Sequence, residues 1–424
     1  MRCPLHVRTL LGAALGAGLG GLSFLLWGGP AEAAALGGFV EYFARPAGQI
    51  FLRLLFMLVV PLLFSSLALG VAGLGDLKSL GRVGLKTLGY TVLVSSAAVL
   101  LGVFLVDLVR PGDGISPELR ARLLAGASER TAGLASATAP RTGLDLFVQI
   151  VPDNPLRAAV NGDYLAVMFF ALLFGVGLTL TKSEASRRLE GTIEGLYEVA
   201  MRLIHVVLGF APIGVFALLF TLTVELGYEV LGQLARYVGV VVFALAFHQF
   251  VVFSLMVKFL GGRSPIWFFR GIQQAMITAF STSSSNATLP TALEVAEERL
   301  KLPPHVSRFV LTIGSTANQN GTALFEGVTV LFLAQVYGVE LSLANQVLVV
   351  LICVLGGIGT AGVPAGSIPV VAMILGMVHV PPEGIGLILG VDRFLDMCRT
   401  TLNVTGDLVA AVVVSRGEEK HSTV

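Results

Sequence analysis

Six charged or amide side chains interrupt the last long apolar segment of the chain, between Gly390 and Val414. They are Asp392, Arg393, Asp396, Arg399, Asn403 and Asp407. On a helix that turns about 100° per residue, all of them except Arg393 fall within roughly 80° of one another. An ionised side chain near the centre of a bilayer costs at least ~2.5 kcal/mol. The stripe therefore indicates a water-filled cavity or a charged ligand, and this segment is a candidate functional site.

Arg399 and Asp396 lie one helical turn apart on that stripe and offer complementary chemistry. A planar guanidinium matches a carboxylate with two parallel hydrogen bonds. A carboxylate in turn accepts hydrogen bonds from an ammonium group. The pair fits a ligand that carries both charges, and the alternative is a purely structural ion pair within the membrane.

The composition indicates a polytopic membrane protein. The chain has 424 residues, of which 55% are hydrophobic and 13% charged, whereas soluble domains average about 25% charged residues. The net charge of +1 gives no reason to expect nucleic-acid binding, and the three cysteines have neither disulfide nor metal-ligand spacing. No nucleophile motif or metal-ligand helix is apparent, so we expect neither an enzyme nor a cofactor.

Long apolar stretches predict the membrane segments. The first six are 9–28, 47–73, 87–109, 144–181, 195–226 and 232–261, and the last four are 264–300, 305–337, 343–380 and 384–414. Polar or glycine-rich clusters at 281–286, 318–321 and 356–364 interrupt the later ones. Serine, glycine and proline runs break helices, and broken backbone at membrane depth lines cavities. The pattern predicts two re-entrant hairpins that meet at a central site, with a seventh helix between them, as in secondary transporters with inverted repeats.

Basic residues in short loops predict the orientation. Lys78, Arg82 and Lys86 share one loop, and Lys258, Arg263 and Arg270 another. The positive-inside rule places both loops on the cytoplasmic side and gives eight transmembrane helices with both termini in the cytoplasm. The segment 110–143 opposes this topology, because as an external loop it carries five arginines against three acids.

The N-terminal apolar run has two interpretations. Ala31-Glu32-Ala33 resembles a signal-peptidase site. The run from Thr9 to Gly28 is about 20 residues long, which exceeds a typical signal core and suffices to span a bilayer. We therefore expect a retained first helix.

Four ordered motifs resemble those of the glutamate transporter, or dicarboxylate/amino acid:cation symporter, family. Residues 283–290 read SSSNATLP, similar to the serine-rich first-hairpin tip, and 318–322 read NQNGT where NMDGT is usual. Residues 359–364 read GTAGVP, like the second tip, and 392–407 follow the pattern D-x3-D-x2-RT-x2-N-x-TGD. Segments 59–62 and 211–217 also look like family segments.

The resemblance implies an all-α polytopic membrane protein with eight transmembrane helices, two re-entrant hairpins and inverted repeats. It implies a homotrimer in the inner (plasma) membrane that works as an elevator. Scaffold helices 1–2 would lie in 1–74, transport-domain helix 3 in 75–110, an external loop with scaffold helices 4–5 in 111–226, and the rest of the transport domain in 227–424.

The resemblance also implies a site for an acidic amino acid. Arg399 would bind the side-chain carboxylate of aspartate or glutamate, Asp396 the α-amino group, and Asn403 with the hairpin tips the α-carboxylate. Dicarboxylate members look different at the amino-binding position, so Asp396 favours an amino acid. The full implied set is Ser283, Ser284, Ser285, Thr322, Val363, Ser367, Asp396, Arg399, Thr400 and Asn403.

Ser283 stands where some prokaryotic members carry an arginine. Arg393 would compensate for that charge, or else it only packs or snorkels.

The implied cation sites depart from the family in part. One sodium site looks retained, since its oxygen ligands suit a hard cation: Gly314, Asn318, Asn403 and Asp407. A second site is left open, because Gly357 and Gln319 replace the usual serine and methionine: Thr316, Gly357, Ile358 and Thr360. A third looks degraded, with Asn320 at the acid position, Val94 at a threonine position and Thr91 at a tyrosine position, beside Ser95.

The lost charge and ligand oxygen in the third site would weaken cation binding by several kcal/mol, roughly. We therefore expect reduced or altered sodium coupling, with Na⁺, H⁺ or both as coupling ions. Glu326 resembles the acid that carries the cotransported proton in animal members, and the alternative is a carboxyl that stays neutral within the helix bundle. Burial favours that neutral form.

The sequence thus predicts a secondary active transporter of acidic amino acids that resides in a lipid bilayer. An ordinary sodium:aspartate symporter, a dicarboxylate transporter, and an anion channel or ligand-gated receptor remain the alternatives.

Overall fold

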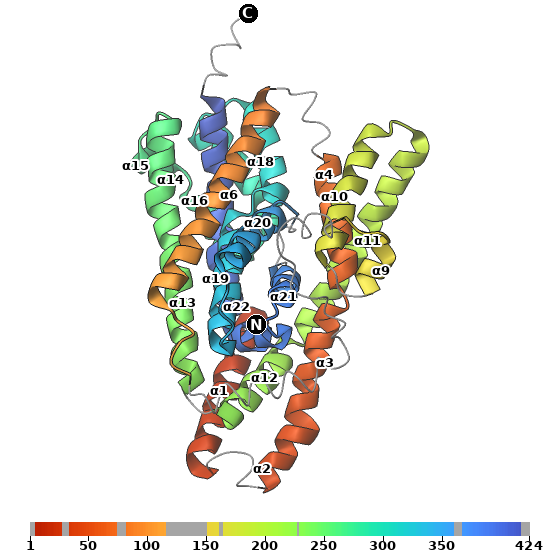
Figure 1. The fold of residues 1–424 in the computed structure, drawn as a ribbon. Helices are drawn as coiled ribbons and strands as arrows, with labels where there is room; N and C mark the ends of the chain where they lie inside the picture. Colours follow the sequence, from red (N-terminus) through yellow and green to blue (C-terminus); the bar gives the residue numbers. More distant parts are fainter. Residues whose placement is uncertain are drawn as a thin grey trace, which may run out of the picture.

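The computed structural model describes residues 5–27, 34–73, 82–115, 151–160, 164–226, 229–359 and 367–416, and within these ranges it is helical without a strand (Figure 1). The predicted class, an all-α membrane protein, agrees with this structure. Among the described residues, five helical segments are long and apolar enough to cross a membrane: Val7–Trp27, Leu36–Leu69, Val83–Val109, Leu231–Leu260 and Ile385–Ser415. A sixth results if two helices bent by 57°, Glu184–Gly209 and Ala211–Val224, count as one span. Length and composition therefore identify five or six of the eight predicted spans.

The first half of the chain forms helices separated by short breaks. They are α1 (Leu5–Trp27), α2 (Ala34–Phe39), η1 (Val40–Ala44), α3 (Arg45–Phe56), α4 (Val59–Gly73), α6 (Arg82–Val109), α9 (Pro155–Val160), α10 (Tyr164–Leu180), α11 (Glu184–Gly209) and α12 (Ala211–Leu226). The helix α1 packs along α12 through glycines. A Cβ at Gly12 would lie 2.3 Å from the Pro212 carbonyl oxygen, and one at Gly16 would lie 2.4 Å from that of Phe216. Such close approach of backbones is how small residues pack membrane helices.

The second half contains shorter helices around one long one. It comprises α13 (Glu229–Phe247), η3 (His248–Val252), α14 (Phe253–Leu255), η4 (Met256–Leu260), α15 (Pro265–Gly271), α16 (Gln273–Thr282), α17 (Ser285–Glu294), η5 (Val295–Arg299), α18 (Pro304–Ala317), α19 (Asn320–Tyr337), α20 (Leu343–Gly359), α21 (Ser367–Met377), η6 (Pro382–Gly384) and α22 (Ile385–Ser415). The last helix, α22, contacts α16, α17, α18 and α19.

A helical hairpin lies where the serine-rich cluster predicts one. Ser283 ends α16 in the left-handed conformation, with φ 51°. Ser284 caps α17, because its hydroxyl accepts a hydrogen bond from the Ala287 N–H at 3.2 Å. The arms α16 and α17 pack against each other and against α22. The serine tip is thus brought to the long helix that carries the polar stripe.

The predicted seventh helix is broken in the structure, at the polar cluster 318–321. Between α18 and α19, Asn318 and Gln319 have non-helical backbone angles, with φ/ψ of −114°/58° and −92°/55°. Both side chains are buried. The second hairpin has the arms α20 and α21, but its tip, with Thr360 and Val363, lies outside the described residues. Lys78 and most of the segment 110–143 also lie outside them.

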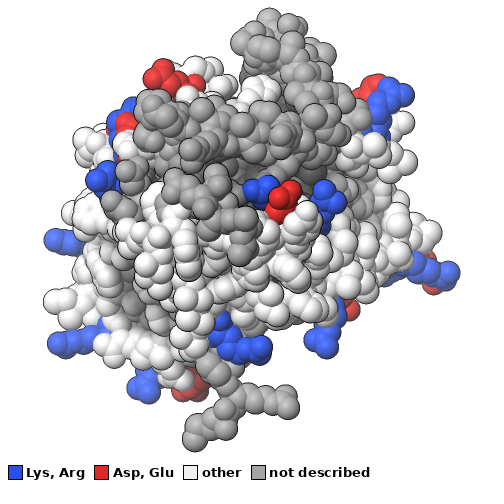
Figure 2. All heavy atoms as spheres, turned by 90° about the horizontal axis from the view of Figure 1, so that it is seen from below, with Lys and Arg blue, Asp and Glu red and all other residues white. Residues whose placement is uncertain are grey.

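The helices form two groups (Figure 1). In one, α4 packs with α10 and α11. In the other, α19 packs with α6, α20 and α22, and α13 packs with α22. The arms α20 and α21 also contact α4, so the second hairpin touches both groups. On the face shown in Figure 2, most of the described atoms belong to uncharged residues, and the basic side chains lie mainly toward the edge, with one further group of basic and acidic side chains nearer the middle.

Candidate functional site

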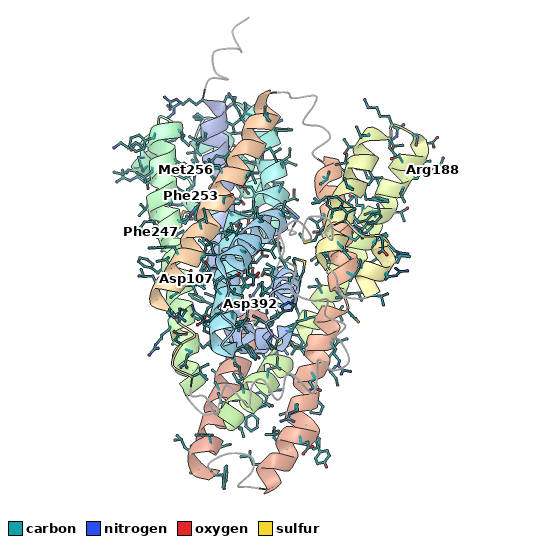
Figure 3. The ribbon with its side chains drawn as sticks, viewed as in Figure 1. Asp107, Arg188, Phe247, Phe253, Met256 and Asp392 are labelled. Atoms are coloured by element: carbon teal, nitrogen blue, oxygen red, sulfur yellow. The ribbon has the colours of Figure 1, made fainter. Side chains whose placement is uncertain are left out.

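The polar stripe of α22 points into the protein. Its five members are each at most 5% exposed: Asp392, Asp396, Arg399, Asn403 and Asp407. Arg393, which the helical period excludes from the stripe, has a side chain that is 25% exposed. Figure 3 places Asp392 within the helix bundle, whereas Arg188 lies at its outer edge. The sequence prediction of a single interior-facing stripe therefore agrees with the structure.

The Arg399 guanidinium is held by both acids of the first half of α22. Its Nη1 donates to Asp392 Oδ1 at 3.1 Å, and its Nε and Nη2 lie 3.0 and 2.9 Å from Asp396 Oδ1. The plane of the guanidinium lies over the Phe325 ring, 4.3 Å from its centroid, which adds a cation–π contact. Arg393 Nη1 reaches the other Asp396 oxygen, Oδ2, at 3.4 Å. The two arginines therefore neutralise the two acids, and the charge of Arg393 acts on Asp396 rather than on its neighbour Asp392.

The Asn403 amide joins the middle of α22 to the start of α19. Its Oδ1 accepts from the backbone N–H groups of Gly321 and Thr322, at 2.7 and 3.3 Å. Its Nδ2 donates to Gln319 Oε1 at 2.6 Å and to Thr322 Oγ1 at 3.0 Å. All the hydrogen-bonding capacity of this amide is used within the protein.

Asp407 has a different environment from the other two acids. Its Oδ1 accepts from Asn318 Nδ2 at 2.8 Å, and a Cβ at Gly314 would lie only 2.5 Å from the same oxygen. The carboxylate forms no salt bridge within the part of the chain that the structure describes. The structure thus brings together three members of the predicted sodium site, and their oxygen-rich, uncompensated character fits a hard cation.

The residues of the second predicted cation site are only partly placed. The Gly357 carbonyl accepts from the Gln319 N–H at 3.2 Å. The Thr316 side chain is exposed and donates to the Ile313 carbonyl at 3.0 Å. Thr360 lies outside the described residues. Ile358 belongs to the C-terminal end of α20, next to Gly357.

The third predicted site is buried and uncharged. Thr91, Val94 and Ser95 lie on α6, which packs along α19, and each is at most 3% exposed. Asn320 is fully buried at the start of α19. Among the described residues, neither polar atom of its side chain has a hydrogen-bond partner, and nor does the Ser95 hydroxyl.

Four serines, one threonine and one valine complete the predicted substrate set. Ser283, Ser284 and Ser285 are buried at the tip of the first hairpin, and Ser285 Oγ lies 3.5 Å from Gln319 Oε1. Thr400 is buried beside Arg399 on α22. Ser367, the first residue of α21, is also buried. The fourth tip residue, Val363, is outside the described ranges.

Glu326 lies on α19 and is completely buried. Neither oxygen of its carboxyl group has a hydrogen-bond partner among the described residues. A Cβ at Gly356 would lie 3.3 Å from its Oε2, so the carboxyl group faces the first arm of the second hairpin.

Three residues of the site were not singled out as site members by the sequence. Gln319 was noted only as a replacement, yet it joins Asn403 to the first hairpin. Phe325 lies beneath Arg399 but stands in an apolar run that gives no signal. Tyr90 donates its hydroxyl to the Gly406 carbonyl at 3.2 Å, and its position directly before Thr91 was the available clue.

Comparisons with known proteins agree with the resemblance. The family described as the sodium:dicarboxylate symporter family matches residues 5–417. The chain is 34% identical over 376 residues to the proton/glutamate-aspartate symporter of Escherichia coli (strain K12), covering 88% of this chain and 85% of that protein. It is 36% identical over 377 residues to the proton/sodium-glutamate symport protein of Bacillus subtilis (strain 168), with 89% and 86% covered. It is also 34% identical over 376 residues to the C4-dicarboxylate transport protein of Rhodospirillum rubrum, with 88% and 82% covered.

Proposed function

The chain belongs to the sodium:dicarboxylate symporter family, and we propose that it is a secondary active transporter of acidic amino acids. The observation that carries the proposal is Arg399, which is 1% exposed and held between Asp392 and Asp396. A buried guanidinium in a neutral cluster is costly to maintain for stability alone. It is well suited to bind a carboxylate that enters with its own positive charge.

An acidic amino acid matches this cluster charge by charge. Its side-chain carboxylate binds the Arg399 guanidinium, which releases the Asp396 carboxylate. Its ammonium group then binds that carboxylate. The α-carboxylate then meets the Asn403 amide and the hairpin tips. A plain dicarboxylate offers nothing to the released Asp396. Relatives of similar identity are named for glutamate and for C4-dicarboxylates, so their names do not choose between the two classes of substrate. Asp396 favours an amino acid, because only an amino acid offers it an ammonium group.

The site lies within one of the two helix groups, which supports movement of that group as a unit. We assign 75–110 and 227–424 to a moving transport domain, and 1–74 and 111–226 to a scaffold that holds a homotrimer in the inner membrane. Both termini would then be cytoplasmic by the positive-inside rule. Two hairpins on either side of a single charged site favour alternating access over a channel.

Reconstitution into liposomes tests the proposal. Labelled aspartate, glutamate and succinate are offered with sodium, proton and potassium gradients imposed one at a time. We expect aspartate and glutamate to accumulate above the external concentration when an inward sodium or proton gradient is present. Equilibration without accumulation would indicate a channel, and accumulation of succinate alone would indicate a dicarboxylate transporter.

Proton coupling through Glu326 is a second proposal with its own observation. A carboxyl group that is fully buried and unpartnered among the described residues must be neutral when the loaded domain moves, since a lone buried charge is costly. Glu326→Gln should abolish uptake driven by an inward proton gradient, while exchange of internal for external substrate persists. The matched control is Glu297→Gln, which removes an acid that pairs with the exposed Arg308. Normal proton-driven uptake by Glu326→Gln contradicts this role.

A further inference from the structure

Gln319 connects four elements of the candidate site from one buried position. Its side chain is 2% exposed although it lies in the break between α18 and α19. Its Oε1 accepts from Asn403 Nδ2 of α22 at 2.6 Å, and Ser285 Oγ of the first hairpin tip lies 3.5 Å from the same oxygen. Its Nε2 donates to the Ser315 carbonyl of α18 at 2.8 Å, and its backbone N–H donates to the Gly357 carbonyl of α20 at 3.2 Å.

The Asn403 amide has no free donor in this arrangement. An asparagine amide has two N–H donors, and here one is used by Gln319 Oε1 and the other by Thr322 Oγ1. A substrate carboxylate that binds Asn403 must therefore replace one of these two acceptors. Thr322 is the more firmly held of the two, because its backbone N–H also binds Asn403 Oδ1 and it belongs to the first turn of α19.

We propose that Gln319 is a positioning residue that holds Asn403 until substrate binds and then yields it to the α-carboxylate of the substrate. This inference rests on the proposed function. A carboxylate is a stronger acceptor than an amide oxygen, so the exchange favours the substrate. The Nε2 bond to Ser315 keeps the glutamine side chain in place while its oxygen is displaced.

The displaced oxygen has a new donor within reach. A buried acceptor that loses its partner pays a desolvation penalty, and the Ser285 hydroxyl is the group next to Gln319 Oε1. Shortening of that 3.5 Å contact pairs the oxygen again and draws the tip of the first hairpin toward α18 and α19. Gln319 thus transmits the occupancy of Asn403 to the hairpin tip.

Two substitutions of Gln319 are expected to change affinity in opposite directions. Gln319→Met keeps the length of the side chain but removes the competing acceptor, so aspartate should bind roughly two- to tenfold more tightly, the equivalent of one neutral hydrogen bond. Gln319→Glu places an anion on Asn403 that binds it more strongly and repels a carboxylate, so aspartate should bind at least about tenfold more weakly. Both are measured by titration of aspartate into the purified full-length protein.

A second readout separates this role from a structural one. Gln319→Met should lower the thermal midpoint of the substrate-free protein, and saturating aspartate should reduce the deficit, because the Asn403 contact is then absent from the wild type as well while the bond to Ser315 remains. The matched control is Gln335→Met, on α19. Gln335 donates to the Val106 carbonyl at 3.3 Å and accepts from the Gly112 N–H at 3.1 Å. Its loss should leave aspartate affinity unchanged and lower the midpoint equally with and without aspartate.

The outcomes distinguish this inference from the function on which it rests. If the wild type binds no aspartate or glutamate, the proposed function fails and the inference fails with it. If the wild type binds and Gln319→Met leaves affinity unchanged or reduces it, the inference alone is overturned. A thermal deficit in Gln319→Met that is equally large with and without saturating aspartate overturns it as well. Should Gln319→Met not fold, Gln319→Glu decides the matter, since aspartate affinity equal to that of the wild type contradicts the proposal.

Discussion

The two halves of α22 face the same interior but differ in how their charges are compensated. In the first half, Asp392 and Asp396 are paired with Arg399, and Arg393 adds a further contact to Asp396. In the second half, the hydrogen bond that Asp407 receives from the described residues comes from the neutral amide of Asn318. A buried charge without a counter-charge costs several kcal/mol, roughly.

The difference indicates what each half is built to bind. Paired charges can be exchanged for the charges of a ligand that carries both signs, without leaving any of them alone. An unpaired carboxylate instead gains most from a cation. We therefore infer that the first half of α22 recognises the amino acid and that the second half recognises the coupling cation.

The largest effect is expected at Arg399. Arg399→Cys removes the guanidinium and leaves two buried acids, so the affinity for aspartate and glutamate should fall by at least about a hundredfold. Neutral amino acids should gain access to the site. Uptake of labelled aspartate and serine into proteoliposomes measures both changes. Arg308→Cys, which removes an exposed arginine paired with Glu297, is the control. Aspartate uptake with wild-type affinity in Arg399→Cys rules out the assignment.

The second half is tested by Asp407→Asn, which keeps the shape of the side chain and removes its charge. Sodium should then stimulate aspartate binding far less, because Asp407 is the only carboxylate among the proposed sodium ligands. Its loss should weaken sodium binding by roughly several kcal/mol. The measurement is aspartate affinity at low and high sodium. Asp153→Asn, at an exposed site paired with Arg157, should behave as the wild type does. Unchanged sodium stimulation in Asp407→Asn contradicts the division of α22.

A smaller and more selective effect is expected at Asp396. Asp396→Asn removes the acceptor for the substrate ammonium, and a charged hydrogen bond contributes about 1.5–3 kcal/mol, or roughly ten- to a hundredfold in affinity. Aspartate should lose that much, whereas succinate has no ammonium and should lose little. Competition assays with both compounds measure the ratio. Equal losses for the two compounds count against the role of Asp396.

These sites were partly predictable from the sequence. The period of a helix placed Asp396, Arg399 and Asn403 on one face, and the serine-rich cluster at 281–286 predicted the first helical hairpin. Both predictions depend only on local spacing. The period does not identify the residues of other helices that meet that face, so it could not reveal Phe325 under Arg399 or the bond between Gln319 and Asn403. Contacts between residues distant in sequence require the packed structure.

The smallest effect is expected where a cation site has lost its charge. Val94 and Asn320 are buried on the packed helices α6 and α19. Val94→Thr combined with Asn320→Asp restores a hydroxyl and an anionic oxygen, so aspartate affinity should depend on sodium more steeply than in the wild type. Each single variant serves as a control for the other. A double variant with the sodium dependence of the wild type shows that the site cannot be restored in this way.

The most direct test of the division of α22 is the dependence of aspartate affinity on sodium in the wild type. Aspartate is titrated into the purified protein across sodium concentrations, with choline maintaining the ionic strength. Linkage requires the slope of log Kd against log sodium concentration to report the number of coupled cations. The retained sodium site predicts a slope of magnitude about one, and a contribution from the second, undecided cation site raises that magnitude to about two. A slope of zero contradicts the cation-binding half of α22, and a slope of three contradicts the loss of the third site.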